Sequence, residues 1–307
     1  MDLVFLLEQT LNGLGYGLML FLLAAGLTLV FGIMDTLNLA HGALFMAGGY
    51  VSASVHTHSG SFLLAIAVGI AVTVALAAVL EAVLIRKLYA RDHLSQVLAT
   101  FGVILMADDV VKAIWGPSPI MASTPAALSG PVQLFGFLPY PSYRLLILAA
   151  GLAAALALYL LVSHTKLGMW VRAGASNRQM AQWMGIRVNR VFAIVFAMGA
   201  ALAALAGALM APISAVQVGM GEHILIPALV VIVIGGIGSV RGALIASLLV
   251  GLVDTAGRAL LPPLLREVLS PTLAAADIGP AVASIAMYVL MAGVLVFKPS
   301  GLFPARG

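Results

Sequence analysis

Apolar runs separated by short polar breaks fill almost the whole chain. An α-helix needs about 20 apolar residues to cross the hydrocarbon core of a bilayer. Runs close to that length occupy residues 11–33, 61–85, 94–114, 143–163, 191–212 and 281–297, and shorter ones occupy residues 41–55, 224–234 and 243–257. The two-residue alternation of a membrane β-barrel is absent from the sequence. The pattern predicts one all-α, polytopic membrane domain over residues 1–307, with eight or nine transmembrane segments that include broken or half-length helices.

Two breaks in the apolar pattern, Asp35–Gly42 and Gly235–Gly242, adjoin the shorter runs. Backbone that leaves the helix at membrane depth persists only where protein covers it or where it faces a water-filled cavity. We therefore expect both breaks to approach a subunit interface and to line the inner end of a translocation path. The residues expected there are Asn38, His41, Gly42, Gly235, Gly236, Gly238 and Ser239. In the alternative interpretation the glycines serve helix packing and His41 caps a helix end.

Residues 164–190 form the only long polar interruption, with five of the 15 Lys and Arg residues and no acidic residue. The centre of this segment, Arg172–Ile186, contains no proline, which favours a short helix. On such a helix, residues four apart share one face. A stripe of small residues would then form from Ala173, Asn177, Ala181 and Gly185, beside the larger Met180, Trp183 and Met184. This face could dock a cytoplasmic partner, or the segment could be a solvated loop at the lipid headgroups.

Positive charge predicts the orientation of the chain, because Lys and Arg collect in cytoplasmic loops. We place eleven cations inside, namely Arg86, Lys87, Arg91, Lys166, Arg172, Arg178, Arg187, Arg190, Arg241, Lys298 and Arg306, and four outside, namely Lys112, Arg144, Arg258 and Arg266. The N-terminus is then outside and the C-terminus inside, which requires an odd number of crossings. Nine crossings are predicted; an eight-span arrangement would make one short segment re-entrant.

Two proline-rich stretches are predicted to be extracytoplasmic, at residues 117–142 and 258–280. The first holds six of the 14 prolines and no charged residue, a density that excludes a helix. In the second, four prolines at positions 262, 263, 271 and 280 predict another irregular segment.

The composition excludes several classes of protein and of functional site. With 63% hydrophobic and 8% charged residues, it lies outside the range of soluble globular proteins. The net charge of +4 belongs to cytoplasmic loops rather than to a nucleic-acid surface. There is no cysteine, no nucleophile–base set and no metal-ligand constellation, and the glycine-rich break lacks the Gly-Lys-Ser/Thr ending of a phosphate loop. We expect neither catalysis nor a bound metal or cofactor.

Acidic residues in the apolar runs are expected to form local ion pairs. Asp108 and Asp109 are one helical turn from Lys112, Asp254 is one turn from Arg258, and Glu81 is within reach of Arg86 or Lys87. A proton or cation relay through Asp108 and Asp109 is the alternative.

Four groups of residues, in this order, resemble the permeases of branched-chain amino acid ABC importers, the LivH-type family. They are Ala25–Gly32 with Asn38–Gly42, then Glu81 and Arg86 with Leu98–Gly102, then the motif of the 164–190 segment, then Gly235–Ser239 with Gly242–Ala243. The resemblance implies that the 164–190 segment is the cytoplasmic coupling loop that ATPase subunits grip. Its coupling residues would be Arg172, Ala173, Asn177, Arg178, Ala181, Gly185 and Ile186.

The same resemblance implies the rest of the assembly. The chain would pair with itself or with a second, related permease in the bacterial inner membrane. Two cytoplasmic ATPase subunits would carry ATP and Mg²⁺, and an extracytoplasmic binding protein would deliver the substrate. Branched-chain or other hydrophobic amino acids are the expected substrates, while urea, amides, small organic acids and sugars remain open. An ion-coupled secondary carrier is the alternative from another class.

Overall fold

The computed structural model describes residues 3–34, 38–89, 91–268 and 278–303, and these are almost entirely helical. Nine helices of 16 residues or more carry the fold, each on one of the nine predicted apolar runs. They are α1 (Leu3–Met34), α2 (His41–Ser59), α3 (Phe62–Leu80), α5 (His93–Trp115), α6 (Ser142–His164), α9 (Val188–Met210), α10 (Met220–Gly235), α11 (Val240–Val268) and α12 (Ile278–Phe297). The all-α membrane bundle expected from the sequence is thus confirmed.

Short elements connect these helices. A π-helical turn, η1 (Glu81–Ile85), extends α3 into α4 (Arg86–Leu88), and α7 (Lys166–Ser176) and α8 (Arg178–Trp183) lie between α6 and α9. The predicted non-helical segment 117–142 contains a 3₁₀ turn, η2 (Ala126–Leu128), and an antiparallel hairpin of β1 (Pro131–Leu134) and β2 (Leu138–Pro141). Two backbone hydrogen bonds of 2.9 Å between Ile120 and Val216 fasten this segment to the turn between α9 and α10.

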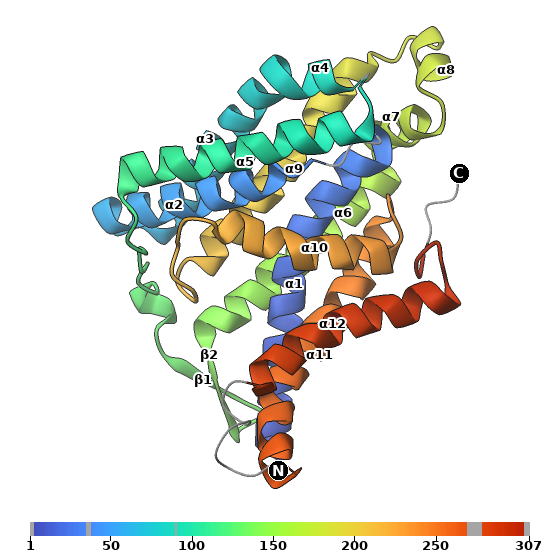
Figure 1. The fold of residues 1–307 in the computed structure, drawn as a ribbon. Helices are drawn as coiled ribbons and strands as arrows, with labels where there is room; N and C mark the ends of the chain where they lie inside the picture. The colour runs from blue at the N-terminus through green and yellow to red at the C-terminus, as the bar shows by residue number, and fades with distance from the viewer. Residues whose placement is uncertain (1–2, 35–37, 90, 269–277, 304–307) are drawn as a thin grey trace.

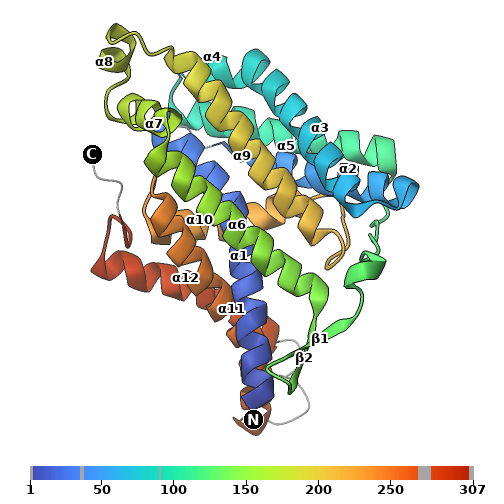
Figure 2. The same cartoon turned by 180° about the vertical axis from the view of Figure 1, so that it is seen from behind.

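Helix α1 runs through the centre of the bundle, with α11, α9, α6 and α10 packed around it (Figures 1 and 2). Every residue from Leu20 to Ala25 has an exposed fraction of 0%. A helix that is apolar on all sides is suited to such a central position. Helices α7 and α8 lie at one end of the molecule, and the first turns of α1 lie with the hairpin at the other (Figure 1).

Five of the described helical segments are long and apolar enough to cross a membrane, namely Leu3–Gly32, Phe62–Leu88, Ser142–His164, Val188–Met210 and Val240–Pro262. Helix α10, with 16 residues, is only about 24 Å long, less than the roughly 30 Å of a bilayer core. This matches the predicted half-length segment at 224–234. The chain is therefore a multi-pass membrane protein with helices of unequal length.

The prediction of an irregular segment at residues 258–280 is wrong for its first part. Helix α11 continues past Arg258 through Pro262 as far as Val268. The φ angle to which proline is restricted lies within the helical range, so a proline here removes a hydrogen bond without forcing the chain to turn. Residues 269–277 of the predicted segment lie outside the described residues.

Helix contacts in the bundle depend on small residues that let two backbones approach. A methyl group at Gly48 of α2 would lie 2.4 Å from the Cα atom of Ala204 in α9, and one at Gly207 of α9 would lie 2.1 Å from the carbonyl oxygen of Phe45. In lipid, helix association depends on such close packing, because the hydrophobic effect provides no driving force between helices. The high glycine content thus has a direct structural use.

We predict that Gly207→Ala lowers the thermal unfolding temperature of the purified protein in detergent. The added methyl group must displace the backbone of α2, and overpacking of this kind typically costs about 1–3 kcal/mol. Gly102→Ala in α5 is the matched control, since a methyl group there has no neighbour within 4 Å. Equal unfolding temperatures for the two variants would show that the α2–α9 approach does not limit stability.

Candidate functional site

The 164–190 segment forms two helices instead of the single helix predicted for Arg172–Ile186. Asn177 adopts an extended conformation between α7 and α8, and its side-chain oxygen accepts a hydrogen bond of 2.9 Å from the backbone N–H of Met180. Asn is a strong N-cap residue, so it begins a new helix here. The predicted stripe of small residues required Asn177 to lie inside one continuous helix. Thr165 caps α7 in the same way, through the backbone N–H of Gly168 at 3.2 Å.

The break at Asn177 changes which side of the segment faces outward. Ala181, at the centre of the predicted small-residue stripe, is only 3% exposed and packs against the chain itself, with Ala173 half-buried and Ile186 half-buried. Trp183 and Met184 are instead 76% and 78% exposed, and Met180 is also exposed. We call Met180, Trp183 and Met184 the coupling surface. Met180 and Trp183 lie on α8, which projects from the end of the molecule (Figure 1), and Met184 follows α8 directly.

Further predicted coupling residues also interact within the chain. The Arg172 guanidinium donates a hydrogen bond to the carbonyl oxygen of Val162 at the end of α6. Gly185 has a φ of 86°, a left-handed conformation that suits glycine, and it ends α8. The adjacent backbone N–H of Ile186 then donates to the carbonyl oxygen of Ala181 at 3.0 Å. These residues hold the shape of the segment.

Arg178 connects α8 to the transmembrane helices. Its guanidinium carbon lies 5.0 Å from the ring centroid of Phe192 in α9 and 5.8 Å from that of Tyr89, and the two rings meet edge to face at 5.3 Å. A cation within about 6 Å of an aromatic face is attracted by the ring. Arg178 also donates to the side-chain oxygen of Asn189 at 3.4 Å. The first residue of α8 therefore packs against two aromatic rings.

Tyr89, one of the two aromatic residues beside Arg178, also contacts a buried carboxylate. Glu81 is 2% exposed, and it accepts hydrogen bonds from Arg86 at 2.8 and 3.2 Å and from the Tyr89 hydroxyl at 3.1 Å. Glu81 and Arg86 are five residues apart, and the π-helical turn between them brings that spacing into contact. The expected Glu81–Arg86 pair is thus confirmed, and it links α8 through Tyr89 to α3.

The other predicted ion pairs were partly right. Arg258 pairs with Asp254 at 2.8 Å, and Lys112 pairs with Asp109 at 3.3 Å. Asp108 does not pair with Lys112, but accepts a hydrogen bond of 3.3 Å from the backbone N–H of Gly219 before α10. Among the described residues, no three His, Asp or Glu side chains lie close enough to share a metal ion.

The described part of the first predicted break, residues 38–42, is buried or half-buried, and residues 35–37 lie outside the described residues. Asn38 and His41 have exposed fractions of 0%. The Asn38 side-chain oxygen accepts a hydrogen bond from Ala40 at 3.1 Å, and the Leu39 N–H donates to the Thr100 hydroxyl of α5 at 3.2 Å. The His41 imidazole fills space left by glycine, because a methyl group at Gly26 would lie 2.8 Å from its Nε2 atom.

The second break is partly buried, with Gly235 and Gly236 buried and Ile237 49% exposed. Gly236 and Gly238 have φ angles of 96° and 80°, and the Ser239 hydroxyl accepts a hydrogen bond of 3.1 Å from Gly242. The C-terminal segment closes the end of α10, as Leu302 and Phe303 donate to the carbonyl oxygens of Ile234 and Gly235 at 2.8 and 3.1 Å.

Both breaks meet the C-terminal half of α1. A methyl group at Gly32 would lie 2.8 Å from the Cα atom of Gly238, further along α1 than the contact between Gly26 and His41. Gly42 and Gly235 make similarly close backbone contacts with Gly221 and Gly242. These contacts favour the packing interpretation, and a role for the breaks in a translocation path stays a prediction.

A third polar region, in the N-terminal half of α1, was not singled out from the sequence. A cavity of about 530 Å³ lies between α1, α6 and α11, near the hairpin. Its polar lining includes Gln9, Asn12, Tyr16, Tyr140, Arg144, Thr255 and Arg258. The sequence did indicate this polar region, because Gln9, Asn12 and Tyr16 recur at helical spacing on one face of α1.

Comparison with known proteins identifies the family of the chain. Residues 9–297 match the family described as branched-chain amino acid transport system / permease component. The chain belongs to this family. The LivH-type resemblance drawn from the sequence is therefore confirmed, and the chain is a permease with the helical bundle of a membrane transporter.

Relatives of this permease match along most of their length. BraD of Pseudomonas aeruginosa, a high-affinity branched-chain amino acid transport system permease, is 29% identical and covers 96% of this chain and 95% of its own. LivH of Escherichia coli, with the same description, is 28% identical over 87% of this chain and 91% of its own. The ribose import permease RbsC of Escherichia coli is 26% identical over 76% of this chain and 72% of its own. No solved structure matches the permease.

We predict that Arg86→Ala lowers the thermal unfolding temperature of the permease, because it leaves the buried Glu81 carboxylate without its cation. Breaking one side of a buried pair costs more than removing both charges, so Glu81→Gln in the same chain should recover part of the loss. Arg91→Ala, at a nearby exposed cation with no ion pair in the described structure, is the control. If Arg86→Ala and Arg91→Ala unfold at the same temperature, the pair does not stabilise η1.

Proposed function

We propose that this chain is the permease subunit of an ATP-driven importer of branched-chain and other hydrophobic amino acids. The observation that carries the proposal is the coupling surface, where Trp183 and Met184 are exposed on a cationic segment beyond the membrane-spanning helices. Large exposed apolar side chains outside the bilayer are typical of a protein–protein interface. The family of the chain supports an ATPase as the partner.

The assembly that we propose has three further kinds of subunit. A second permease, either a copy of this chain or a related one, completes the membrane domain. Two ATPases grip the 164–190 segments from the cytoplasm and hold ATP and Mg²⁺, for which this chain has no nucleotide motif. A binding protein outside contacts the proline-rich 117–142 segment and the outer part of 258–280, and membrane lipid surrounds the bundle.

Hydrophobic amino acids are the favoured substrates because the permeases BraD and LivH, described for branched-chain amino acids, match over at least 87% of this chain. The match to the ribose permease RbsC is shorter, which makes a sugar the second candidate. Urea, amides and small organic acids are further candidates of the same transporter class. Uptake of radiolabelled leucine and ribose by the assembled transporter distinguishes the two leading substrates.

A secondary carrier would need a buried charge that is free to bind an ion. The buried acidic side chains Glu81 and Asp254 are instead paired with Arg86 and Arg258, and Asp108 accepts a backbone hydrogen bond. These partners favour an importer that is powered by a separate ATPase.

The proposed orientation puts the N-terminus outside and the C-terminus inside. The cationic helices α4, α7 and α8 gather at one end of the molecule, opposite the uncharged hairpin (Figure 1). Cytoplasmic loops collect Lys and Arg, which supports the assignment of the α7–α8 end to the cytoplasm of a bacterial inner membrane.

We predict that single cysteines introduced as Ser59→Cys and Ser129→Cys react with an impermeant thiol reagent added to intact cells, whereas Ser176→Cys reacts only after lysis. All three positions are exposed, and the natural chain has no cysteine to interfere. Labelling of Ser176→Cys in intact cells would reverse the orientation.

We also predict that Trp183→Ala weakens ATPase binding and ATP-driven uptake of leucine. Removing a central aromatic anchor from an interface costs about 2 kcal/mol or more, roughly a 30-fold loss of affinity. Phe137→Ala, at an exposed aromatic on the opposite hairpin, is the control and should co-purify with the ATPases normally. If Trp183→Ala co-purifies normally with the ATPases, the coupling surface is not part of the interface. The proposal would then lose its main support.

A further inference from the structure

The outer cavity has the size and position of a small-molecule site. Its volume of about 530 Å³ lies within the range of about 300–1,000 Å³ that is usual for ligand pockets. One face of α1, the start of α6, the end of α9 and the outer half of α11 enclose it. It is thus at the end of the permease that a substrate delivered from outside reaches first.

One wall of the cavity is apolar. Met19, Ile147, Met210 and Ile213 line it, from α1, α6, α9 and the turn that follows α9. Ile147 is almost fully buried, and Met210 and Ile213 are partly exposed. A ligand that fills this part of the cavity has an apolar portion of a few carbon atoms.

The lining also includes a guanidinium with unused donors. Arg144 donates one hydrogen bond to the Asn12 side-chain oxygen, which also accepts from the Tyr140 hydroxyl at 3.0 Å. A guanidinium has five N–H groups, and in the described structure Arg144 uses one of them and has no carboxylate within 4.0 Å. Arg258, the other cation of the cavity, is held in two hydrogen bonds by Asp254 and is neutralised. Arg144 is therefore the cation that is available to an anionic ligand.

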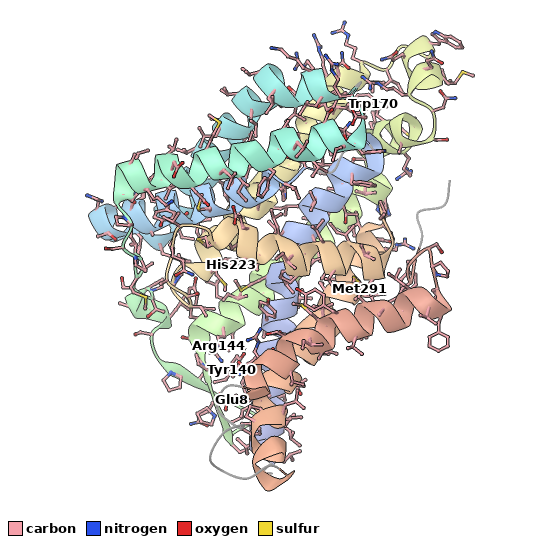
Figure 3. All side chains as sticks on the ribbon, viewed as in Figure 1. Glu8, Tyr140, Arg144, Trp170, His223 and Met291 are labelled. Atoms are coloured by element: carbon pink, nitrogen blue, oxygen red, sulfur yellow. The ribbon has the colours of Figure 1, made fainter. Side chains whose placement is uncertain are left out.

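The carboxylate of Glu8 lies near the Arg144 guanidinium but forms no ion pair with it. Glu8 precedes Gln9 of the cavity lining on α1, and Glu8, Tyr140 and Arg144 lie together at the outer end of the molecule (Figure 3). The charges of Arg144 and Glu8 both act on the Tyr140 hydroxyl, whose pKa is raised chiefly by burial. Two opposite charges that are close but unpaired can receive the two charges of a zwitterion.

We propose that the outer cavity binds an apolar amino acid during entry, with the ligand carboxylate on Arg144, its ammonium group towards Glu8 and its side chain against Met19 and Ile147. The chemistry fits because guanidinium–carboxylate contacts are among the strong, charge-assisted hydrogen bonds. This site rests on the proposed function and adds to it a place in the permease where the substrate is selected. A site of this kind must release its ligand inward, so weak binding is expected.

The test measures binding of tritiated leucine to the full chain in phosphatidylcholine nanodiscs, without any binding protein. Arg144→Gln should lower the affinity for leucine by about tenfold or more, as expected for a lost charge-assisted contact. It should lower the affinity for 4-methylpentanoate as well, because that acid keeps the carboxylate. Binding of leucinamide, which lacks the carboxylate, should not change.

Glu8→Gln gives the complementary result. It should weaken the binding of leucine but leave the binding of 4-methylpentanoate unchanged, because that acid has no ammonium group. Ala259→Phe, which places a large side chain in the cavity without altering a charge, should weaken all three ligands. The matched control is Lys112→Gln, which removes an outer cation that pairs with Asp109 on α5, away from the cavity.

Two outcomes of the binding measurements overturn the site. One is unchanged leucine binding in both Arg144→Gln and Ala259→Phe, the second variant guarding against misfolding of the first. The other is leucine binding by the natural chain that disappears in phosphatidylglycerol nanodiscs, which would assign the cavity to lipid phosphate. Failure of the proposed function is distinguishable, because the natural chain assembled with its ATPases would then take up no leucine. Normal uptake by both the natural chain and Arg144→Gln would refute this site alone.

Discussion

Close approach of backbones along α1 is the constraint on which the rest of the structure depends. Each of four glycines on this helix faces another backbone: Gly13 faces Gly251, Gly17 faces Ser247, Gly26 faces Gly199 and Gly32 faces Gly238. Lipid is as apolar as the side chains, so van der Waals packing must hold the helices together. Larger residues at these positions would separate α11 and α9 from α1. The central helix thus determines where both breaks and the cavity lie.

The same packing determines what the polar groups can do. Near the C-terminal end of α1, Asn38 and His41 are fully buried, and the hydrogen bonds of the Asn38 side-chain oxygen, the Ser239 hydroxyl and the C-terminal segment are all made within the fold. Towards the N-terminal end of α1, residues of α1, α6 and α11 line the cavity, and Arg144 keeps donors that the protein does not use. A polar group with a protein partner stabilises the fold, whereas one without is available to a ligand.

Side-chain contacts connect the 164–190 segment to the transmembrane helices. Arg178 rests against Tyr89 and Phe192, and Tyr89 donates to the buried Glu81. A displacement of α8 is therefore opposed by contacts with α9 and with the π-helical turn of α3. Such a turn is frequently found at functional sites. The exposed Trp183 and Met184 lie on the same short helix, so a partner bound there contacts the element that these residues hold.

The sequence by itself determined the nine helices, the multi-pass topology, the Glu81–Arg86 and Asp254–Arg258 pairs and the family. These properties depend on apolar length and on residues close in the chain, which periodicity and spacing report directly. Only the tertiary structure decided that Ala181 faces inward, because the cap at Asn177 ends the helical register on which the predicted stripe depended. It also revealed the cavity, where Asn12, Arg144 and Arg258 come from helices more than 100 residues apart in the chain. Such a site depends on which helix faces meet, and the pattern along one helix does not contain that information.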